Sequence, residues 1–304
     1  MDVLERDFYE ERRRKWRRSA FWRGFFVASA LGLLVAAIAW RDEIGRATDQ
    51  VARFEISGVI IDDPGRDALL ADIADSDNVK ALLLRINSPG GSTAGSEALF
   101  ASLRAVAAKK PVVAVLGEVA ASGGYIAAIG ADHIVARGNS ATGSIGVILE
   151  YPDFTDLMAR LGIGIETVRS SELKAEPSPF RPTNPAARAL DQAMIDESYG
   201  WFRGLVGERR GLEGARLDAV ATGAVFTGRV ALDRGLIDEI GGEPEAIAWL
   251  ESRDATLTDL PTADWEQESE ETFLGGLLGL SGSSGGILGE ISTRIGPKLY
   301  SLMR

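Results

Sequence analysis

The chain has 304 residues, of which 45% are apolar and 25% charged, as is ordinary for a folded protein with a sizeable core. A net charge of −11 argues against nucleic acid as a partner. The absence of cysteine excludes disulfides, thiol nucleophiles and cysteine-based metal sites. A single histidine, His133, disfavours a zinc site and leaves a Ser-His-Asp triad only one possible base.

An uncharged apolar run covers residues 24–40. As a helix it would span about 26 Å, slightly less than a bilayer core. Trp22 and Trp40 stand at its ends, where interfacial aromatic residues belong, and residues 12–23 carry seven basic groups and no acidic one. The sequence therefore predicts a cytoplasmic N-terminus (1–23), a transmembrane signal anchor (24–40) and a linker (41–50).

Two other interpretations of this run remain open. Residues 37–39 read Ala-Ile-Ala, a form typical of signal-peptide cleavage sites. A helix buried in a soluble core is the third interpretation. The long basic region and the 17-residue core favour an uncleaved anchor.

Beyond residue 50, strand-like and helix-like segments alternate. Strands are predicted at 51–61, 79–87, 112–116 and 133–136, and helices at 66–74, 93–108 and directly after Ser122. Such alternation is typical of parallel crossovers and hence of a layered α/β fold.

The second half is predicted to be mainly helical. Helices are expected near 153–161 and at 186–210, 217–222, 229–234 and 244–252, with a strand at 165–169 and an irregular, proline-rich stretch at 175–185. The composition becomes rich in glycine after about residue 255. We therefore predict a main domain over 51–254 and a weakly ordered tail over 255–304.

Ser122 lies between a fully apolar strand (111–117) and an alanine-rich helical stretch (125–130). A serine at this position stands at a helix N-terminus, where unpaired N–H groups favour a developing negative charge. That geometry suits a nucleophile, and it suits an ordinary helix N-cap equally well. The local pattern leaves both interpretations open.

A second glycine turn, Gly90-Gly91, also follows a buried strand. It is either a tight strand–helix turn or a place where backbone N–H groups approach a ligand. Turns after neighbouring parallel strands gather at one sheet edge, so N–H groups of Gly90 or Gly91 and of Gly123 could surround a carbonyl attacked by Ser122. His133 begins a strand instead, so we expect it to lie away from this edge.

Four motifs occur in a fixed order: Asn-Ser-Pro-Gly-Gly at 87–91, Ala-Ala-Ser-Gly-Gly-Tyr at 120–125, Thr-Gly-Ser-Ile-Gly-Val at 142–147, and Leu-Lys with Pro-Phe-Arg over 173–181. Together, over about residues 50–250, they resemble the signal peptide peptidase A (SppA) family of serine peptidases, in its short bacterial form. The resemblance implies a crotonase-like fold related to Clp protease, built of repeated ββα units. It further implies that Ser122 is the nucleophile, Lys174 its base and Ser144 a residue that orients the lysine.

The resemblance also implies a function and a location. The expected activity is that of a membrane-anchored endopeptidase that degrades remnant signal peptides or other hydrophobic peptides. Its expected location is the bacterial inner (cytoplasmic) membrane, with one membrane pass and an extracytoplasmic, periplasmic catalytic domain. The expected partners are peptide substrates, membrane lipid around the N-terminal helix and further copies of the chain, with no nucleic acid, metal or cofactor.

The lysine motif differs from the pattern common in the family. Where that pattern has Tyr-Lys-Asp followed by Gly-Ser-Pro-Phe-Arg, this chain has Leu-Lys-Ala (173–175) followed by Glu-Pro-Ser-Pro-Phe-Arg (176–181). A lysine acts as a base only when neutral, so its surroundings must favour the uncharged form. The residues around Lys174 therefore bear directly on the mechanism.

The sequence leaves two other functions open. An acyl-CoA hydratase or isomerase on the same fold would need a carboxylate base, for which Glu118 is the nearest candidate. A membrane scaffold with an idle Ser122–Lys174 pair would need no base at all.

Overall fold

The computed structural model describes residues 48–266 and 300–302, together with residues 22–23, 25–26, 29–30 and 32. The chain divides into two compact units, residues 1–49 and 50–304. In the first unit the described positions before residue 33 are helical, and the ring centroids of Trp22 and Phe25 lie 5.8 Å apart. Most of the predicted anchor (24–40) lies outside the described residues, and among those described no helix is long and apolar enough to cross a bilayer.

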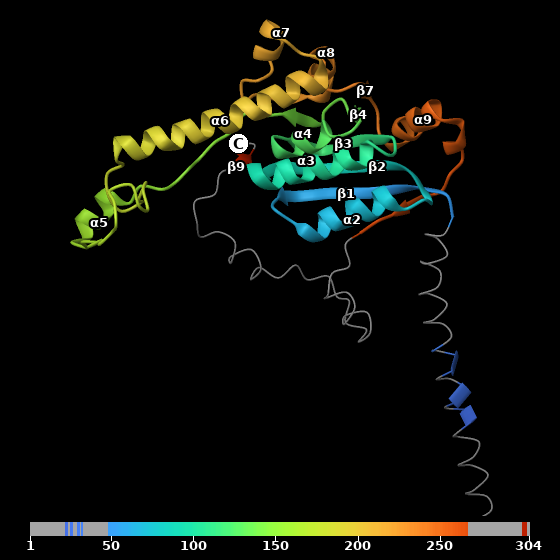
Figure 1. The fold of residues 1–304 in the computed structure, drawn as a ribbon, viewed down its shortest axis with the longest axis horizontal. Helices are drawn as coiled ribbons and strands as arrows, with labels where there is room; N and C mark the ends of the chain where they lie inside the picture. Colours follow the sequence, from blue (N-terminus) through green and yellow to red (C-terminus); the bar gives the residue numbers. More distant parts are fainter. Residues whose placement is uncertain are drawn as a thin grey trace, which may run out of the picture. The chain divides into compact units, whose positions relative to one another are not determined.

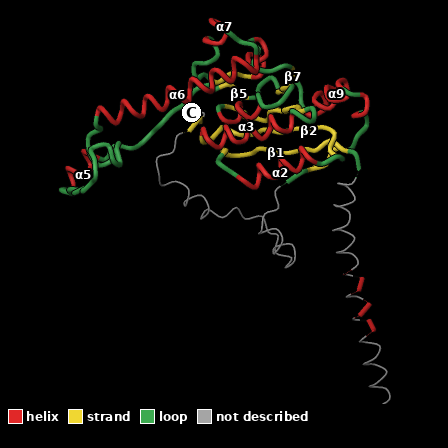
Figure 2. The backbone as a smooth tube through the Cα atoms, viewed as in Figure 1, coloured by secondary structure: helices red, strands yellow, loops and turns green. Residues whose placement is uncertain are grey.

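The second unit is built on a mixed, mostly parallel sheet (Figures 1 and 2). Its strands are β1 (Gln50–Ile60), β2 (Val79–Ser92), β3 (Val112–Ala121), β4 (His133–Ala136), β5 (Ala141–Gly143), β6 (Val225–Thr227), β7 (Glu239–Ile240), β8 (Thr262–Asp264) and β9 (Tyr300–Leu302). The main path runs β6-β5-β3-β2-β1-β8, with β4 beside β3 and β7. Among the described strands, only the pairs β5–β6 and β2–β9 are antiparallel, and this mostly parallel sheet confirms the predicted α/β class.

Alternating side chains of the central strands separate two apolar layers. Leu82 and Leu84 of β2 belong to the larger core, under α2 (Pro64–Asp75), α3 (Thr93–Ala107) and α4 (Gly123–Ala128). Ala81 and Leu83 face the other way, into a smaller core that α9 (Glu243–Arg253) closes. Because strand side chains alternate between faces, a run apolar at every position indicates a strand covered on both faces.

The remaining helices are α5 (Thr155–Leu161), α6 (Pro185–Arg210), α7 (Gly214–Asp218), α8 (Gly228–Asp233) and the 3-10 turn η1 (Ala255–Leu257). At 26 residues α6 is about 39 Å long, and Phe202 and Val206 near its C-terminal end are buried in the larger core. Its other end reaches away from the sheet (Figure 1). We call residues 154–184, which comprise α5 and its connection to α6, the arm.

Three sequence predictions differ from the structure. The helix predicted at 217–222 lies earlier in the chain, since α7 ends at Asp218. The strand predicted at 165–169 is an irregular part of the arm, where Val168 is 96% exposed and pairs with none of the strands that the structure describes. The main domain continues past the predicted boundary at 254, because β8 pairs with Val51–Arg53 of β1 and Trp265 is 7% exposed in the larger core. A short β-branched segment thus does not form a strand where none of the described strands pairs with it.

Candidate active site

Ser122 occupies the turn between β3 and α4 in a conformation that L-residues rarely adopt, with φ 55° and ψ −119°. Its backbone N–H donates to the carbonyl oxygen of Gly143 at 2.8 Å, and its side chain makes no capping hydrogen bond to the helix. The residue is fully buried. A strained serine that does not cap its helix favours the nucleophile interpretation over the N-cap, since such strain is concentrated at functional sites.

The two glycine turns lie against each other. A Cβ atom added to Gly123 would come within 2.3 Å of Ser96 Oγ and 3.1 Å of the backbone nitrogen of Gly91. A Cβ on Gly91 would lie 1.7 Å from the carbonyl oxygen of Ile60. Close approach of the backbone therefore requires glycine at position 91, and the buried Ser96 side chain requires it at position 123. The structure brings the predicted oxyanion candidates together beside Ser122.

A serine that sequence reasoning missed distinguishes the two glycines of the first turn. Gly90, with φ 108°, donates its N–H to the buried Oγ of Ser88 at 3.1 Å. That N–H is consequently engaged within the turn. Gly91 and Gly123 remain the better candidate donors to an oxyanion. The sequence feature that could have predicted this contact is a serine two residues before a glycine, because serine side chains often hydrogen-bond to backbone N–H groups at that spacing.

Ser144 lies directly after Gly143, whose carbonyl holds the Ser122 backbone. It has φ 53°, is 6% exposed, and its N–H donates to the carbonyl oxygen of Ala224 at 2.8 Å. Ser144 also lines a cavity of about 450 Å³ together with Ile148, Ile195, Tyr199 and Val225. The predicted lysine-orienting residue is thus adjacent to the nucleophile in the structure.

An extended segment of the chain lies along the same turn. Strand β9 pairs antiparallel with the end of β2, with Gly91 opposite Ser301 and Gly90 opposite Leu302. On its other side, this end of β2 pairs with Val59 and Ile60 of β1. The edge of β2 that contains the candidate oxyanion glycine therefore accepts an extended peptide backbone.

Lys174 is not brought to Ser122 within this chain. It is an exposed residue of the arm, and its N–H donates to the carbonyl oxygen of Ser171 at 3.2 Å. In Figure 1 the arm lies at the outer end of α6, whereas α4, which begins next to Ser122, lies over the sheet. The predicted nucleophile and base thus occupy separate parts of one copy.

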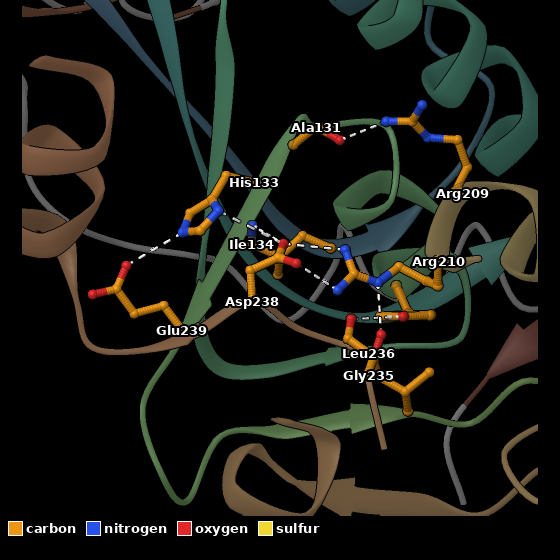
Figure 3. Close-up of polar contacts among 10 residues, drawn as sticks. Ala131, His133, Ile134, Arg209, Arg210, Gly235, Leu236, Asp238 and Glu239 are labelled. Carbon is orange, nitrogen blue, oxygen red and sulfur yellow. Dashed lines mark hydrogen bonds and ion pairs between the residues drawn. The ribbon is translucent and has the colours of Figure 1, made fainter. Parts of the chain in front are cut away.

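His133 lies at the other end of the sheet, as predicted. It is paired with Val113 near the start of β3, whereas Ser122 follows the end of that strand, about 30 Å further along the extended chain. Its ring stacks on Trp249 with centroids 4.7 Å apart, and its Nε2 lies 3.3 Å from Glu239 (Figure 3). His133 is therefore excluded as the base for Ser122 in this chain.

Arg210 reinforces the same structural cluster. It donates to Asp238 through Nη2 at 2.6 Å, and Asp238 in turn accepts from the backbone N–H of Ile134 at 2.8 Å (Figure 3). These contacts connect α6 to β4 and to the residues before β7. The cluster stabilises the sheet end opposite the candidate active site.

Known proteins resemble this chain over most of its length. The model of peptidase family S49 matches residues 104–257, about half of the chain. A provisionally named protease from Synechocystis is 36% identical over 212 residues, which cover 69% of this chain and 75% of the relative. A provisionally named signal peptide peptidase SppA from Enterococcus faecium is 28% identical over 244 residues, covering 75% of this chain and 70% of that protein.

Larger relatives contain more than this chain. Protease 4 of Haemophilus influenzae is 32% identical over 247 residues, which cover 76% of this chain and only 40% of that protein. The matched regions include Ser122, Ser144 and Lys174 within the family model. The chain therefore belongs to peptidase family S49, a family of serine proteases that hydrolyse peptide bonds.

Proposed function

We propose that the chain is a membrane-anchored serine endopeptidase in which Ser122 attacks the substrate and Lys174 is the base. The observation that carries this proposal is Ser122 itself, strained, buried and set between the glycine turns of Gly91 and Gly123. Membership of a peptidase family favours it over the hydratase and scaffold alternatives. Glu118, the base that a hydratase would need, precedes Ser122 on β3 and gains no support from the comparisons.

The proposed reaction follows from these positions. The neutral amine of Lys174 takes the proton of Ser122 Oγ as that oxygen bonds to the peptide carbonyl carbon. The N–H groups of Gly91 and Gly123 hold the oxyanion. The ammonium of Lys174 then protonates the leaving amine as the C–N bond breaks, and water hydrolyses the acyl-enzyme with the same amine as base.

Because the arm carries Lys174 away from its own Ser122, we propose that the dyad forms between copies of the chain. The arm has a markedly apolar and exposed surface: Leu161 is 62% exposed, Ile163 and Ile165 are each 50% exposed, and Val168 is 96% exposed. Exposed apolar patches of this kind mark interaction sites. Packing against a second copy would bury Lys174 and favour its neutral form.

The substrate class is proposed on two grounds. The backbone pairing of β9 with Gly90–Ser92 supports an extended peptide as the ligand of this edge. The adjoining cavity beside Ser144 presents Ile145, Val147 and Ile148, which suits apolar side chains. A relative named as a signal peptide peptidase points to remnant signal peptides or similar hydrophobic peptides.

The decisive test is fluorophosphonate labelling of the full-length protein in detergent between pH 6 and 9. We expect labelling of the wild type that rises with pH and is lost in both Ser122→Ala and Lys174→Ala. Labelling that persists in Lys174→Ala and is lost in Glu118→Gln would reject the proposed base. A folded protein that is never labelled would reject the proposed function.

Sharing of the dyad is tested by mixing the two inactive variants after dissociation in denaturant and refolding together. A serine and a lysine drawn at random from a 1:1 mixture are both intact at about a quarter of shared sites, so about that fraction of the activity should return. A dyad formed within one copy would give no activity in any mixture.

A further inference from the structure

The arm contains one carboxylate that is almost completely buried although most of its neighbours are exposed. The side chain of Glu176 is 2% exposed, while Lys174, two residues earlier, is an exposed residue. Glu176 also lies where the chain departs from the common family pattern around the lysine. A buried carboxylate in a thin, solvated segment requires cations close by.

Two arginines from different parts of the arm supply those cations. Glu176 Oε1 accepts hydrogen bonds from Arg169 Nη1 and, at 2.7 Å, from Arg181 Nε. Arg181 also donates through Nη1 to Thr167 Oγ1 at 3.2 Å. These contacts join residues 167–169 to residues 176–181. We call the chain from 167 to 181, which contains Lys174, the closed segment.

Further contacts fix this segment to the start of α5. The backbone N–H of Phe154 donates to the carbonyl oxygen of Pro179 at 2.7 Å. The rings of Phe154 and Phe180 stack with centroids 6.2 Å apart. The closed segment is therefore held at its base, and Glu176 is the residue that joins its two sides.

We propose that Glu176 is a positioning residue for Lys174, acting as the centre of an Arg169–Glu176–Arg181 clamp that gives the lysine-bearing segment one shape. The proposal rests on the proposed function, because Lys174 needs a fixed position only if it is the base. Proton transfer requires the lysine nitrogen within hydrogen-bond reach of the serine oxygen. An error of about 1 Å in such a position lowers a rate by roughly a hundredfold.

The charge of Glu176 is maintained throughout the working pH range. The hydrogen bond from Arg169, supported by that from Arg181, holds the pKa of Glu176 below its ordinary value despite the opposing effect of burial. Glu176 Oε2 is buried and accepts no hydrogen bond from the part of the chain that the structure describes. The hydrogen bonds from the two arginines to Oε1 are therefore what offsets the cost of burying this carboxylate. Neutralising the carboxylate should consequently open the clamp.

The test compares Glu176→Gln with Glu172→Gln in the full-length protein. Glu172 is an exposed residue two positions before Lys174, so both variants remove one negative charge at the same sequence distance from the lysine. We expect Glu176→Gln to lower the plateau of kcat against pH by roughly tenfold or more, with KM little changed. Glu172→Gln should remain within about twofold of the wild type.

A second readout separates the clamp from the proposed function. Hydrogen exchange over residues 167–181 should accelerate in Glu176→Gln and not in Glu172→Gln. Equal pH profiles for the two variants, or a wild-type plateau in Glu176→Gln, would overturn the positioning role. If the wild type is never labelled, the proposed function fails, and unchanged exchange in Glu176→Gln would reject the clamp separately.

Discussion

The candidate nucleophile and the candidate base are held by two different kinds of structure. Ser122 is fixed by the backbone of a buried sheet, through the Gly143 carbonyl and the glycine turns. Lys174 lies on an arm held by an ion-paired carboxylate, one aromatic stack and a few backbone bonds. The serine side is thus set by the same packing that stabilises the fold, whereas the lysine side can be altered without unfolding the protein.

The largest expected effect comes from adding one methyl group to a glycine in the turn beside Ser122. In Gly91→Ala the new Cβ would stand 1.7 Å from the backbone oxygen of Ile60, so the β1–β2 ladder must shift. We expect an unfolding free energy lower by about 1–3 kcal/mol or more, and loss of labelling. Denaturant unfolding and fluorophosphonate labelling measure the two effects.

The matched control is on the arm. Gly164→Ala meets no atom of its own copy within 4 Å and should leave stability nearly unchanged. Equal effects from the two glycine substitutions would contradict the comparison between a rigid serine side and an adaptable arm.

A smaller effect is expected from Ser88→Ala, which removes the acceptor for the Gly90 N–H. Misdirecting the turn should weaken oxyanion binding, so we expect a fall in kcat of roughly tenfold to a hundredfold. Affinity for a peptide aldehyde, which forms an oxyanion, should fall more than affinity for the matching amide.

Ser140→Ala is the control for that experiment. Ser140 is 3% exposed, and its Oγ both donates to Gly117 and accepts from Arg137. It should reduce stability comparably without changing the aldehyde-to-amide ratio. A fall of that ratio in both variants would indicate general loosening of the sheet.

A still smaller change, in the opposite direction, is expected when residues 300–304 are deleted. Their strand pairs with the Gly90–Ser92 edge while Ser122 is fully buried, so removing it should make the serine easier to reach. Two or so backbone hydrogen bonds of about 0.7 kcal/mol each correspond to a labelling rate up to roughly tenfold higher. Ser301→Pro, which keeps the length but removes an N–H, should act likewise. A slower rate in either variant would show that β9 supports the site instead.

The sequence was sufficient for the parts of the molecule where one pattern determines one structure. A mostly apolar run predicted β2, and a fully apolar run bounded by proline and glycine predicted β3 and the turn at Ser122, because a strand covered on both faces has few polar positions. It was insufficient where the outcome depends on distant partners. The 165–169 segment is rich in β-branched residues yet pairs with none of the described strands, and β8 exists only because β1 has an open edge at Val51–Arg53.

The site shows the same limit. Turns after adjacent strands converge, which predicted Gly91 and Gly123 beside Ser122, and the family resemblance added Ser144. The separation of Lys174 could not be read from the sequence, because it follows from the direction of α6 relative to the sheet. The contacts of Ser88 and Glu176 depend on side-chain geometry that no sequence periodicity encodes.

The smallest expected effect belongs to His133, the only histidine of the chain. In His133→Gln the stack on Trp249 is lost, and the unfolding free energy should fall by about 0.5–1.5 kcal/mol. Labelling of Ser122 and its pH profile should be unchanged, because the ring lies at the opposite end of β3. Denaturant unfolding gives the first quantity and the labelling rate gives the second. Loss of labelling, or a shifted pH profile, in a well-folded His133→Gln protein would contradict the exclusion of His133 as the base for Ser122.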